Sequence, residues 1–250
     1  MYLTRFPINR TRRETRRMLA SPYRLHAAIA GSFPVDAAAD VPAPGPGRVL
    51  WRLDEQGDGL VLFLASPTVP SLTGLDEQIG WPDLPQQWET RDYDAFLDRV
   101  AEGRRYTFRL VANPVVSRAG SRNGRGDSRR MGHLTPLQQA AWLIGAAAYE
   151  GTGVEPPALF ADQTATRAER NGFSVERDEA TGVPRLVVSH ARKLTFDRGA
   201  GGSRITLATA RFDGVLRVTD VRALRRALVE GIGHGKGFGC GMMTIAPLPE

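Results

Sequence analysis

The stretch that decides the fold runs Arg48-Val49-Leu50-Trp51-Arg52-Leu53, continues through the turn Gly57-Asp58-Gly59 and ends in Leu60-Val61-Leu62-Phe63-Leu64-Ala65. Two apolar, strand-like runs joined by a glycine-containing turn predict a β-hairpin. A strand-like run at residues 2–8 and helical sequence from about residue 10 to residue 33 precede this hairpin. The first part of the chain therefore begins with a strand, continues through helical sequence and returns as two paired strands.

The helical sequence is interrupted at Ser21-Pro22. Serine is a good N-cap residue, and proline is favoured at the first helical position because its fixed φ suits a helix start. We therefore expect a second helix to begin there and to run through Tyr23, His26 and Ile29.

On the other side of the hairpin, a helix is predicted at residues 93–101, followed by an alternating strand at 106–111. The order of elements is then βαββαβ, which is the ferredoxin-like plan. Residues 35–47 are rich in Ala, Pro and Gly, and we expect them to form a surface loop. Residues 152–170 look like a second solvent loop.

The second half of the chain contains the elements of another, modified ferredoxin-like unit. A helix is predicted at 135–149 and another at 221–230. The predicted strands lie at 173–176, 185–188, 193–196, 205–210, 215–218 and 242–246. The sequence thus predicts an α+β protein with two tandem ferredoxin-like (RRM-like) domains and antiparallel sheets. The expected divisions are residues 1–116, a basic Gly/Ser/Arg connecting arm at 117–134, and residues 135–250.

Composition is typical of a folded globular protein. The chain has 250 residues, of which 42% are hydrophobic and 24% are charged, and no apolar run is long enough to cross a bilayer. The N-terminal sequence lacks the pattern of a secretory signal, and the single cysteine, Cys240, excludes an intramolecular disulfide. We expect a cytoplasmic protein with no membrane partner.

The charge balance indicates a polyanionic partner. The formal net charge is +6, the pI is about 10.1, and all but two of the 33 basic residues are arginine, the lysines being Lys193 and Lys236. A strongly basic domain is typical of proteins that bind nucleic acid.

Tyr23 and His26 are candidate catalytic residues because they are three residues apart and share one face of a predicted helix. They also lie near the start of that helix, where its partial positive charge favours an anion. An imidazole has an ordinary pKa of about 6.5 and suits proton transfer. The alternative is that the two side chains only line the helix between core and water.

The glycine-rich segment at residues 231–241 is not a nucleotide-binding loop of a known type. A Walker A loop would need glycine where Glu230 stands and serine or threonine where Gly237 stands. The dinucleotide fingerprint fails because no position for its third glycine holds glycine. Two interpretations remain: a backbone that approaches phosphates closely, with Lys236 as a point charge, or a helix C-cap at Gly231 that leads into a tight turn.

Two basic clusters could bind the phosphates of a nucleic acid. Five arginines share the Gly/Ser-rich central stretch, namely Arg118, Arg122, Arg125, Arg129 and Arg130. Four cations flank the predicted turn at 199–202, namely Arg192, Lys193, Arg198 and Arg204. Ordinary surface charge is the alternative interpretation of either cluster.

Other catalytic sites have no support in the sequence. No H-E-x-x-H motif and no cysteine pair is present, and the four histidines are scattered too widely for a recognisable zinc site. The nearest approach to a serine hydrolase elbow, Gly126-Asp127-Ser128-Arg129-Arg130, ends in arginine where glycine is required.

Several landmarks occur together in one order along the chain. They are Met1-Tyr2-Leu3-Thr4, Ser21-Pro22-Tyr23-Arg24-Leu25-His26, Phe108-Arg109-Leu110-Val111-Ala112-Asn113-Pro114, Gly231-Ile232-Gly233-His234-Gly235-Lys236-Gly237-Phe238-Gly239-Cys240-Gly241 and Ala246-Pro247-Leu248. With these landmarks the chain resembles the CasE (Cse-type) endoribonucleases of type I-E CRISPR systems. The resemblance implies two tandem ferredoxin-like domains of the repeat-associated RNA-binding superfamily.

The same resemblance implies cleavage of CRISPR precursor RNA at the base of a repeat hairpin, without metal or any other cofactor. The 2′-hydroxyl would attack, a 2′,3′-cyclic phosphate and a 5′-hydroxyl would form, and the protein would stay bound to the guide RNA beside other Cascade subunits. His26 matches the family's catalytic histidine, as general base, general acid or both, and Tyr23 matches its helper. The RNA-binding candidates are Arg24, Arg118, Arg122, Arg125, Arg129, Arg130, Arg192, Lys193, Arg198, Arg204, Gly233, Gly235, Lys236 and Gly237.

Two rival functions remain open at this stage. A non-catalytic RNA-hairpin-binding or scaffold subunit of the same fold would bind RNA without cutting it. A metal-dependent nuclease would have to rely on carboxylates as ligands, and it would lose activity in chelator.

Overall fold

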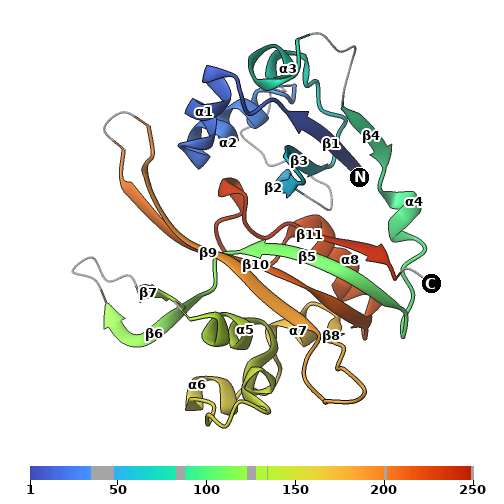
Figure 1. Ribbon diagram of the computed structural model, residues 1–250, viewed down its shortest axis with the longest axis vertical. Helices are drawn as coiled ribbons and strands as arrows, with labels where there is room; N and C mark the ends of the chain where they lie inside the picture. Colours follow the sequence, from blue (N-terminus) through green and yellow to red (C-terminus); the bar gives the residue numbers. More distant parts are fainter. Residues whose placement is uncertain (35–47, 83–87, 123–127, 134, 200–201, 249–250) are drawn as a thin grey trace.

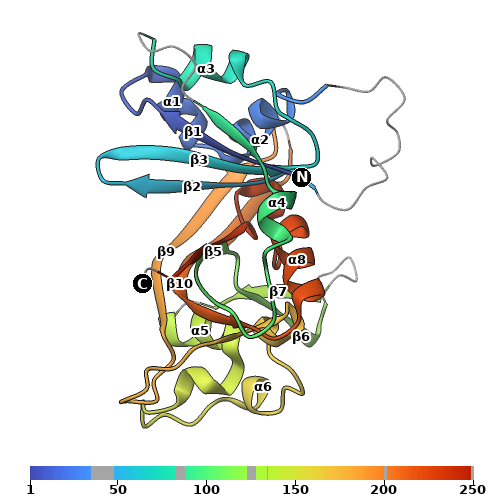
Figure 2. The same ribbon diagram turned by 90° about the vertical axis from the view of Figure 1, so that its right-hand side faces the viewer.

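The computed structural model describes residues 1–34, 48–82, 88–122, 128–133, 135–199 and 202–248. The predicted surface loop at 35–47 lies outside these residues. Two antiparallel sheets and their helices are arranged one above the other along the long axis of the molecule (Figures 1 and 2).

The first sheet contains β1 (Tyr2–Ile8), β2 (Leu50–Gln56), β3 (Gly59–Ser66) and β4 (Glu89–Asp92) in the order β2-β3-β1-β4. All of its pairs are antiparallel. The first strand lies between the third and the fourth, which is the ferredoxin-like order. The predicted hairpin of β2 and β3 is confirmed.

Three helices pack against the first sheet: α1 (Arg13–Leu19), α2 (Pro22–Ala30) and α3 (Thr73–Ile79). The predicted restart at Ser21-Pro22 is confirmed, because Ser21 is extended with φ −142° and Pro22 is the first helical residue. The core between helices and sheet consists of buried side chains, including Phe6, Ile8, Leu25, Ile29, Leu62, Leu64, Leu72 and Ile79. Leu25 and Ile29 bury one face of α2 and leave Tyr23 and His26 partly exposed.

The second sheet has the order β11-β5-β10-β8, and a further strand, β9, also pairs with β10. Its strands are β5 (Arg105–Ala112), β8 (Phe173–Val175), β9 (Leu186–Asp197), β10 (Arg204–Val218) and β11 (Met243–Pro247). All of its pairs are antiparallel. The order again places the first strand beside the last one, so the second ferredoxin-like unit is confirmed.

Helices of the second unit enclose its core. They are α5 (Pro136–Ile144), which continues as the 3-10 turn η1 (Gly145–Tyr149), α7 (Arg167–Arg170) and α8 (Val221–Glu230), and a short α6 (Ala158–Ala161) lies beside η1. The core contains Phe108, Leu110, Trp142, Phe173, Phe212, Leu216, Leu224 and Leu228.

The predicted strand at 106–111 exists as β5, but its assignment to the first sheet is wrong. β5 pairs with β10 and β11 in the second sheet, and β4 completes the first sheet instead. The sequence of β4, Glu-Thr-Arg-Asp, carries no apolar alternation, so it gives no strand signal. A four-residue helix, α4 (Asp94–Leu97), leads from β4 towards β5. We therefore propose that the two units divide between Asp92 and Arg105 and not at residue 116.

β9 and β10 form one long hairpin where two pairs of short strands were predicted. Their pairing runs from Leu186 and Gly214 to Asp197 and Arg204, with an irregularity between Thr209 and Arg211. The hairpin extends beyond the second sheet and reaches α2 of the first unit (Figures 1 and 2). It thereby brings residues of the second unit to the helix that carries His26.

The central basic stretch contains a second hairpin, formed by β6 (Val115–Arg122) and β7 (Ser128–Gly132). The two strands pair from Val115 and Gly132 to Arg122 and Ser128. A connecting arm was predicted here, and the backbone takes the form of a two-stranded ribbon that projects beside α5 (Figure 1).

Candidate functional site

A cavity of about 890 Å³ lies where α2, the end of the β9–β10 hairpin and the glycine-rich segment meet. Its lining consists of Tyr23, His26, Ala27, Ala30, Arg48, Arg198, Gly233, His234, Gly235, Lys236, Gly237 and Phe238. The two units thus contribute opposite walls, and we call this space the His26 cavity.

His26 is half-buried against the 3-10 turn η2 (Lys236–Phe238). A β-carbon placed on Gly237 would lie 3.6 Å from Cε1 of the imidazole, so the ring lies directly over that glycine. The ring of Phe238 meets His26 edge-on at 6.2 Å between centroids and meets Phe196 of β9 at 5.1 Å. This row of three rings connects α2 through η2 to the β9–β10 hairpin.

The pKa of His26 lies below its ordinary value. Burial is the largest cause, and the nearby charges of Arg198 and Arg48 act in the same direction. Both effects disfavour the imidazolium, because burial removes its hydration and the guanidinium groups repel it. The imidazole is therefore neutral at pH 7 and able to accept a proton.

Tyr23 lies one helical turn from His26 on the same side of α2, as its spacing predicts. A β-carbon placed on Gly199, in the turn of the β9–β10 hairpin, would lie 3.7 Å from the Tyr23 hydroxyl oxygen. The hairpin end therefore packs next to the phenol, and Tyr23 and His26 share one cavity.

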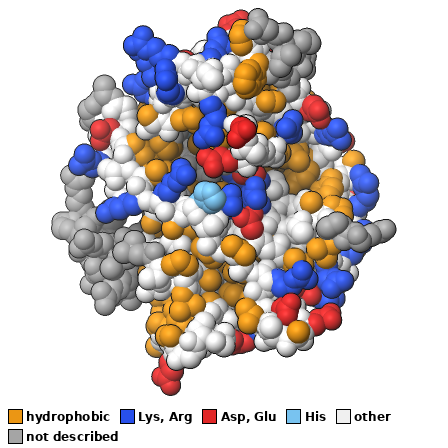
Figure 3. All heavy atoms as spheres, viewed as in Figure 1, with side chains coloured by type: hydrophobic (Ala, Val, Ile, Leu, Met, Phe, Trp, Pro, Cys, Tyr) orange, Lys and Arg blue, Asp and Glu red, His pale blue; other side chains and the backbone are white. Residues whose placement is uncertain are grey.

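Three cations from separate segments line the His26 cavity: Arg48 before β2, Arg198 directly after β9 and Lys236 on η2. Burial, followed by the charge of Arg48, lowers the pKa of Lys236, while Glu230 acts in the opposite direction. A site with these charges at its walls attracts an anion such as a phosphodiester. Figure 3 shows Lys and Arg side chains gathered across the middle of one face of the molecule, with a few acidic side chains among them.

The glycine-rich segment combines both predicted roles. Gly231 ends α8, where its N–H donates to the Ala227 carbonyl oxygen at 2.9 Å, as a C-cap does. The later residues Gly233, Gly235 and Gly237 line the His26 cavity. Gly239 has φ +80°, and a β-carbon there would lie 2.6 Å from Cζ3 of Trp51, so the chain needs glycine at this position.

The structure brings seven of the predicted site residues together around the His26 cavity: Tyr23, His26, Arg198, Gly233, Gly235, Lys236 and Gly237. Three other predicted cations, Arg24, Lys193 and Arg204, are exposed and do not line it. On the central hairpin, β6 carries Arg118 and Arg122 and β7 carries Arg129 and Arg130, whereas Arg125 lies outside the described residues.

Among the lining residues that were not selected from the sequence, two can carry charge, Arg48 and His234. Arg48 precedes β2 without any motif, so only the tertiary structure reveals it. His234 lies within the glycine-rich segment, and its position between two glycines was the available signal. Its backbone forms an isolated β-bridge with Asn113, and the Asn113 Oδ1 accepts a hydrogen bond from the Ala208 N–H at 3.1 Å.

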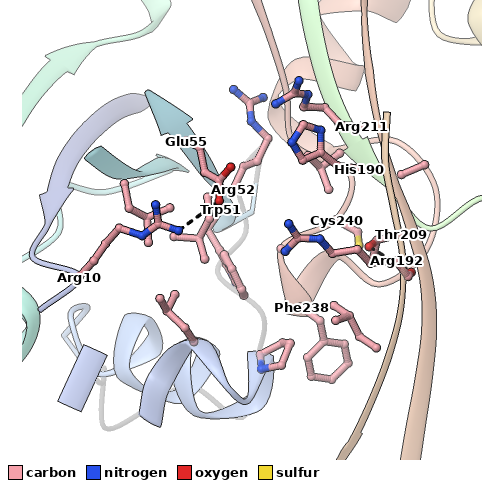
Figure 4. A pocket seen from close by; sticks show the side chains of 18 residues that line it. Arg10, Trp51, Arg52, Glu55, His190, Arg192, Thr209, Arg211, Phe238 and Cys240 are labelled. Carbon is pink, nitrogen blue, oxygen red and sulfur yellow. Dashed lines mark hydrogen bonds and ion pairs between the residues drawn. The ribbon is translucent and has the colours of Figure 1, made fainter. Parts of the chain in front are cut away.

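Arg192 belongs to a second cavity of about 270 Å³ between the two units. Figure 4 shows Arg192 and His190 on the side of the second unit, and Arg10, paired with Glu55, on the side of the first. Phe238 lines both cavities. Arg192, in the middle of β9, therefore lines this second cavity, whereas Arg198, directly after β9, lines the His26 cavity.

Within the part of the chain that the structure describes, no three His, Cys, Asp or Glu side chains are grouped as metal ligands. Over the same residues, every helix is too short or too polar to cross a lipid bilayer.

Comparison with known proteins extends over nearly the whole chain. The family described as "CRISPR associated protein" matches residues 1–247. The chain belongs to this family. The resemblance predicted from the sequence landmarks is thereby confirmed.

This CRISPR-associated protein is similar to the "CRISPR-associated endoribonuclease Cse3" of Thermus thermophilus, with 28% identity over 253 residues, covering 99% of this chain and all of the relative. A solved structure of Thermus thermophilus Cse3, bound to an RNA representing a pre-cleavage complex, has 26% identity and a TM-score of 0.69 and covers 98% of each chain. The CRISPR-associated protein Cas6e from Escherichia coli has the same fold at 22% identity, with a TM-score of 0.58, covering 99% of this chain and all of that one.

Proposed function

We propose that this protein is a metal-independent endoribonuclease that cleaves CRISPR precursor RNA at the base of a repeat hairpin. The observation that carries the proposal is the imidazole of His26 in a cavity that it shares with a phenol and three cations. The similarity to a relative named as an endoribonuclease, along nearly the full chain, supports the same reaction.

In this reaction His26 removes the proton from the 2′-hydroxyl next to the scissile phosphate. The oxygen attacks phosphorus, the bond to the 5′-oxygen breaks, and a 2′,3′-cyclic phosphate and a 5′-hydroxyl form. The lowered pKa of His26 supports the role of base, since the neutral form predominates at pH 7. Tyr23, one turn away, donates a hydrogen bond to the phosphate or a proton to the departing oxygen.

The cations stabilise the phosphorane that forms between attack and departure. Arg48, Arg198 and Lys236 approach the cavity from different segments, so a phosphate at its centre meets positive charge on more than one side. Positive charges that are already in place where the phosphorane becomes negative lower the activation barrier, because the protein does not have to rearrange during the reaction. The glycines beside Lys236 allow the RNA backbone to approach closely.

The stem of the hairpin is held by the arginine-bearing ribbons. The β9–β10 hairpin carries exposed Lys193 and Arg204 outside the cavity, and β6 and β7 carry four more arginines. An A-form stem is bound mainly through shape and phosphates, which suits arginines on extended strands. After cleavage the protein remains on the guide RNA as a Cascade subunit. This last step follows from the family resemblance.

The proposal is tested by incubating the purified protein with a repeat hairpin in excess chelator. We expect cutting at one position at the base of the stem, and no cutting of an otherwise identical RNA with a 2′-deoxy sugar at that position. A scaffold protein would bind both RNAs and cut neither. A metal-dependent nuclease would stop in chelator and would cut the deoxy substrate once metal was restored.

Replacing Arg198 by alanine is expected to raise the pKa of His26, because the guanidinium disfavours the imidazolium. The measurement is an NMR titration of the imidazole protons of His26. Arg204→Ala is the matched control, since Arg204 lies on the same hairpin, is exposed and does not line the cavity. An unchanged pKa in Arg198→Ala would show that this arginine does not face the imidazole in solution.

A further inference from the structure

Arg52 of β2 is an almost completely buried arginine at the contact between the two units, with 2% of its side chain exposed. Nε and Nη2 donate to the two carboxylate oxygens of Asp54, each at 2.7 Å. Nη1 donates to the Met242 carbonyl oxygen at 3.2 Å and to the Arg109 carbonyl oxygen at 2.9 Å. Nη2 also donates to Thr244 Oγ1 at 2.9 Å, so all five N–H donors of the guanidinium are used.

These bonds join one unit to the other. Asp54 belongs to the first sheet, whereas Arg109, Met242 and Thr244 belong to the second unit. Asp54 is 4% exposed and also lies 3.5 Å from Nη1 of Arg109. The Arg109 Nε is in turn 2.5 Å from Asp213 of β10. A buried polar network whose donors are all satisfied makes the structure around it more rigid.

Arg52 is the third of three consecutive β2 residues that contact the glycine-rich segment or Met242, the residue that follows it. Leu50 lies against Gly231, where a β-carbon would come within 2.9 Å of Leu50 Cδ2. The ring of Trp51 lies against Gly239, and Arg52 binds the carbonyl oxygen of Met242. The glycine-rich segment between these contacts carries η2, which covers His26, and Figure 4 shows Trp51 and Arg52 at the adjoining cavity.

We propose that Arg52 is a positioning residue that holds the glycine-rich segment and the β9–β10 hairpin at the correct distance from His26. The inference rests on the proposed function only for its effect on cleavage. Its effect on the geometry of the His26 cavity is independent of any reaction. The physical reason is that the walls of the cavity belong to different units, so their spacing depends on the contact that joins the units.

The test uses the double variant Arg52→Met/Asp54→Leu, which removes both charges and so leaves no unpaired buried ion. We expect a folded protein in which the pKa of His26 moves up towards its ordinary value, because Arg198 and η2 withdraw from the imidazole. Single-turnover cleavage at saturating RNA should fall about 10²-fold, the effect of a displacement of about 1 Å at a reacting centre. RNA affinity should change much less.

Thr244→Val is the milder variant, because it removes one acceptor and keeps the buried ion pair. It should raise the pKa of His26 and lower the cleavage rate, both by less than the double variant does. It also keeps the test valid if the double variant does not fold. Leu216→Ala is the stability control, since Leu216 is a buried residue of the second core. It should lower stability and leave the pKa of His26 unchanged.

The outcomes separate the two proposals. If the wild-type protein does not cut RNA, the proposed function fails, and the titration of His26 still decides the role of Arg52. If the wild-type protein cuts and the folded Arg52 and Thr244 variants keep both the pKa of His26 and the cleavage rate, the positioning role is overturned. An equal shift of the pKa in Leu216→Ala would also overturn it, because loss of stability alone would then suffice.

Discussion

Replacement of His26 by alanine is expected to reduce the single-turnover cleavage rate about 10²-fold to 10⁴-fold, the usual contribution of a positioned acid or base. The fold should survive, because Leu25 and Ile29 bury the core face of α2 and His26 lies on its cavity side. The RNA affinity should remain close to that of the wild-type protein, since the arginine ribbons are unchanged. The measurements are single-turnover kinetics and binding of an uncleavable 2′-deoxy hairpin.

The role of His26 as base also predicts the direction in which the cleavage rate changes with pH. A base whose pKa lies below its ordinary value is already neutral at pH 7, so the wild-type rate should be level there and fall only as the pH drops below about 6.5. His26→Ala should remove this fall. Tyr23→Phe keeps the ring and loses only the hydroxyl. This variant should cut more slowly than the wild-type protein and should still show the fall of the rate at low pH. A His26→Ala variant as active as the wild-type protein would exclude His26 from the reaction.

The second large effect is expected for Gly239→Ala. The residue has φ +80°, and its new β-carbon would lie 2.6 Å from Cζ3 and 2.9 Å from Cη2 of Trp51. The indole is 3% exposed, so it cannot move aside without disturbing the core. The left-handed backbone alone costs about 1–3 kcal/mol, and the collision adds to this. The substitution should also displace η2, which directly precedes Gly239, and should thereby slow cleavage.

The control for this prediction is Gly237→Ala, two residues earlier in the same segment. Its β-carbon would meet nothing closer than 3.6 Å, and its backbone needs no left-handed conformation. Denaturant unfolding should therefore show a lower midpoint for Gly239→Ala and an unchanged midpoint for Gly237→Ala. Equal midpoints for Gly239→Ala and the wild-type protein would contradict the packing of Trp51 against the glycine-rich segment.

Local sequence signals were sufficient for most of the fold. The restart at Ser21-Pro22 and the turn at Gly57-Asp58-Gly59 were visible because each depends on residues a few positions apart. α8 was predicted with its observed bounds, since its apolar residues follow the helical period and glycine follows its end. The ferredoxin-like order then places β1, β2 and β3 together in the first sheet.

Features that depend on distant contacts were missed. β4 is polar, and it forms a strand only because β1 offers an unpaired edge. The continuity of β9 and β10 was hidden by residues 189–192 and 211–214, where polar or small side chains interrupt the apolar pattern. α3 was also missed, although Leu75 and Ile79 bury its apolar side.

The candidate site was predictable in part. The spacing of Tyr23 and His26 placed both on one helical face, and the glycine-rich segment was selected for its composition. Arg198 and Lys236 were among the predicted binding residues, but their meeting with Arg48 beside His26 could not be read from the sequence, because the three cations lie on segments far apart in the chain. Arg192 and Arg198 belong to one predicted cluster, yet Arg192 lies in the middle of β9 and Arg198 directly after it, and they line different cavities.

The most direct test of the central claim is the mass of the two RNA fragments produced in the presence of chelator. Attack by the ribose 2′-hydroxyl, with His26 as the base, predicts a 2′,3′-cyclic phosphate on the upstream fragment and a 5′-hydroxyl on the downstream fragment. Fragments that end in a 3′-hydroxyl and a 5′-phosphate would mean that water attacked instead, and would contradict the mechanism.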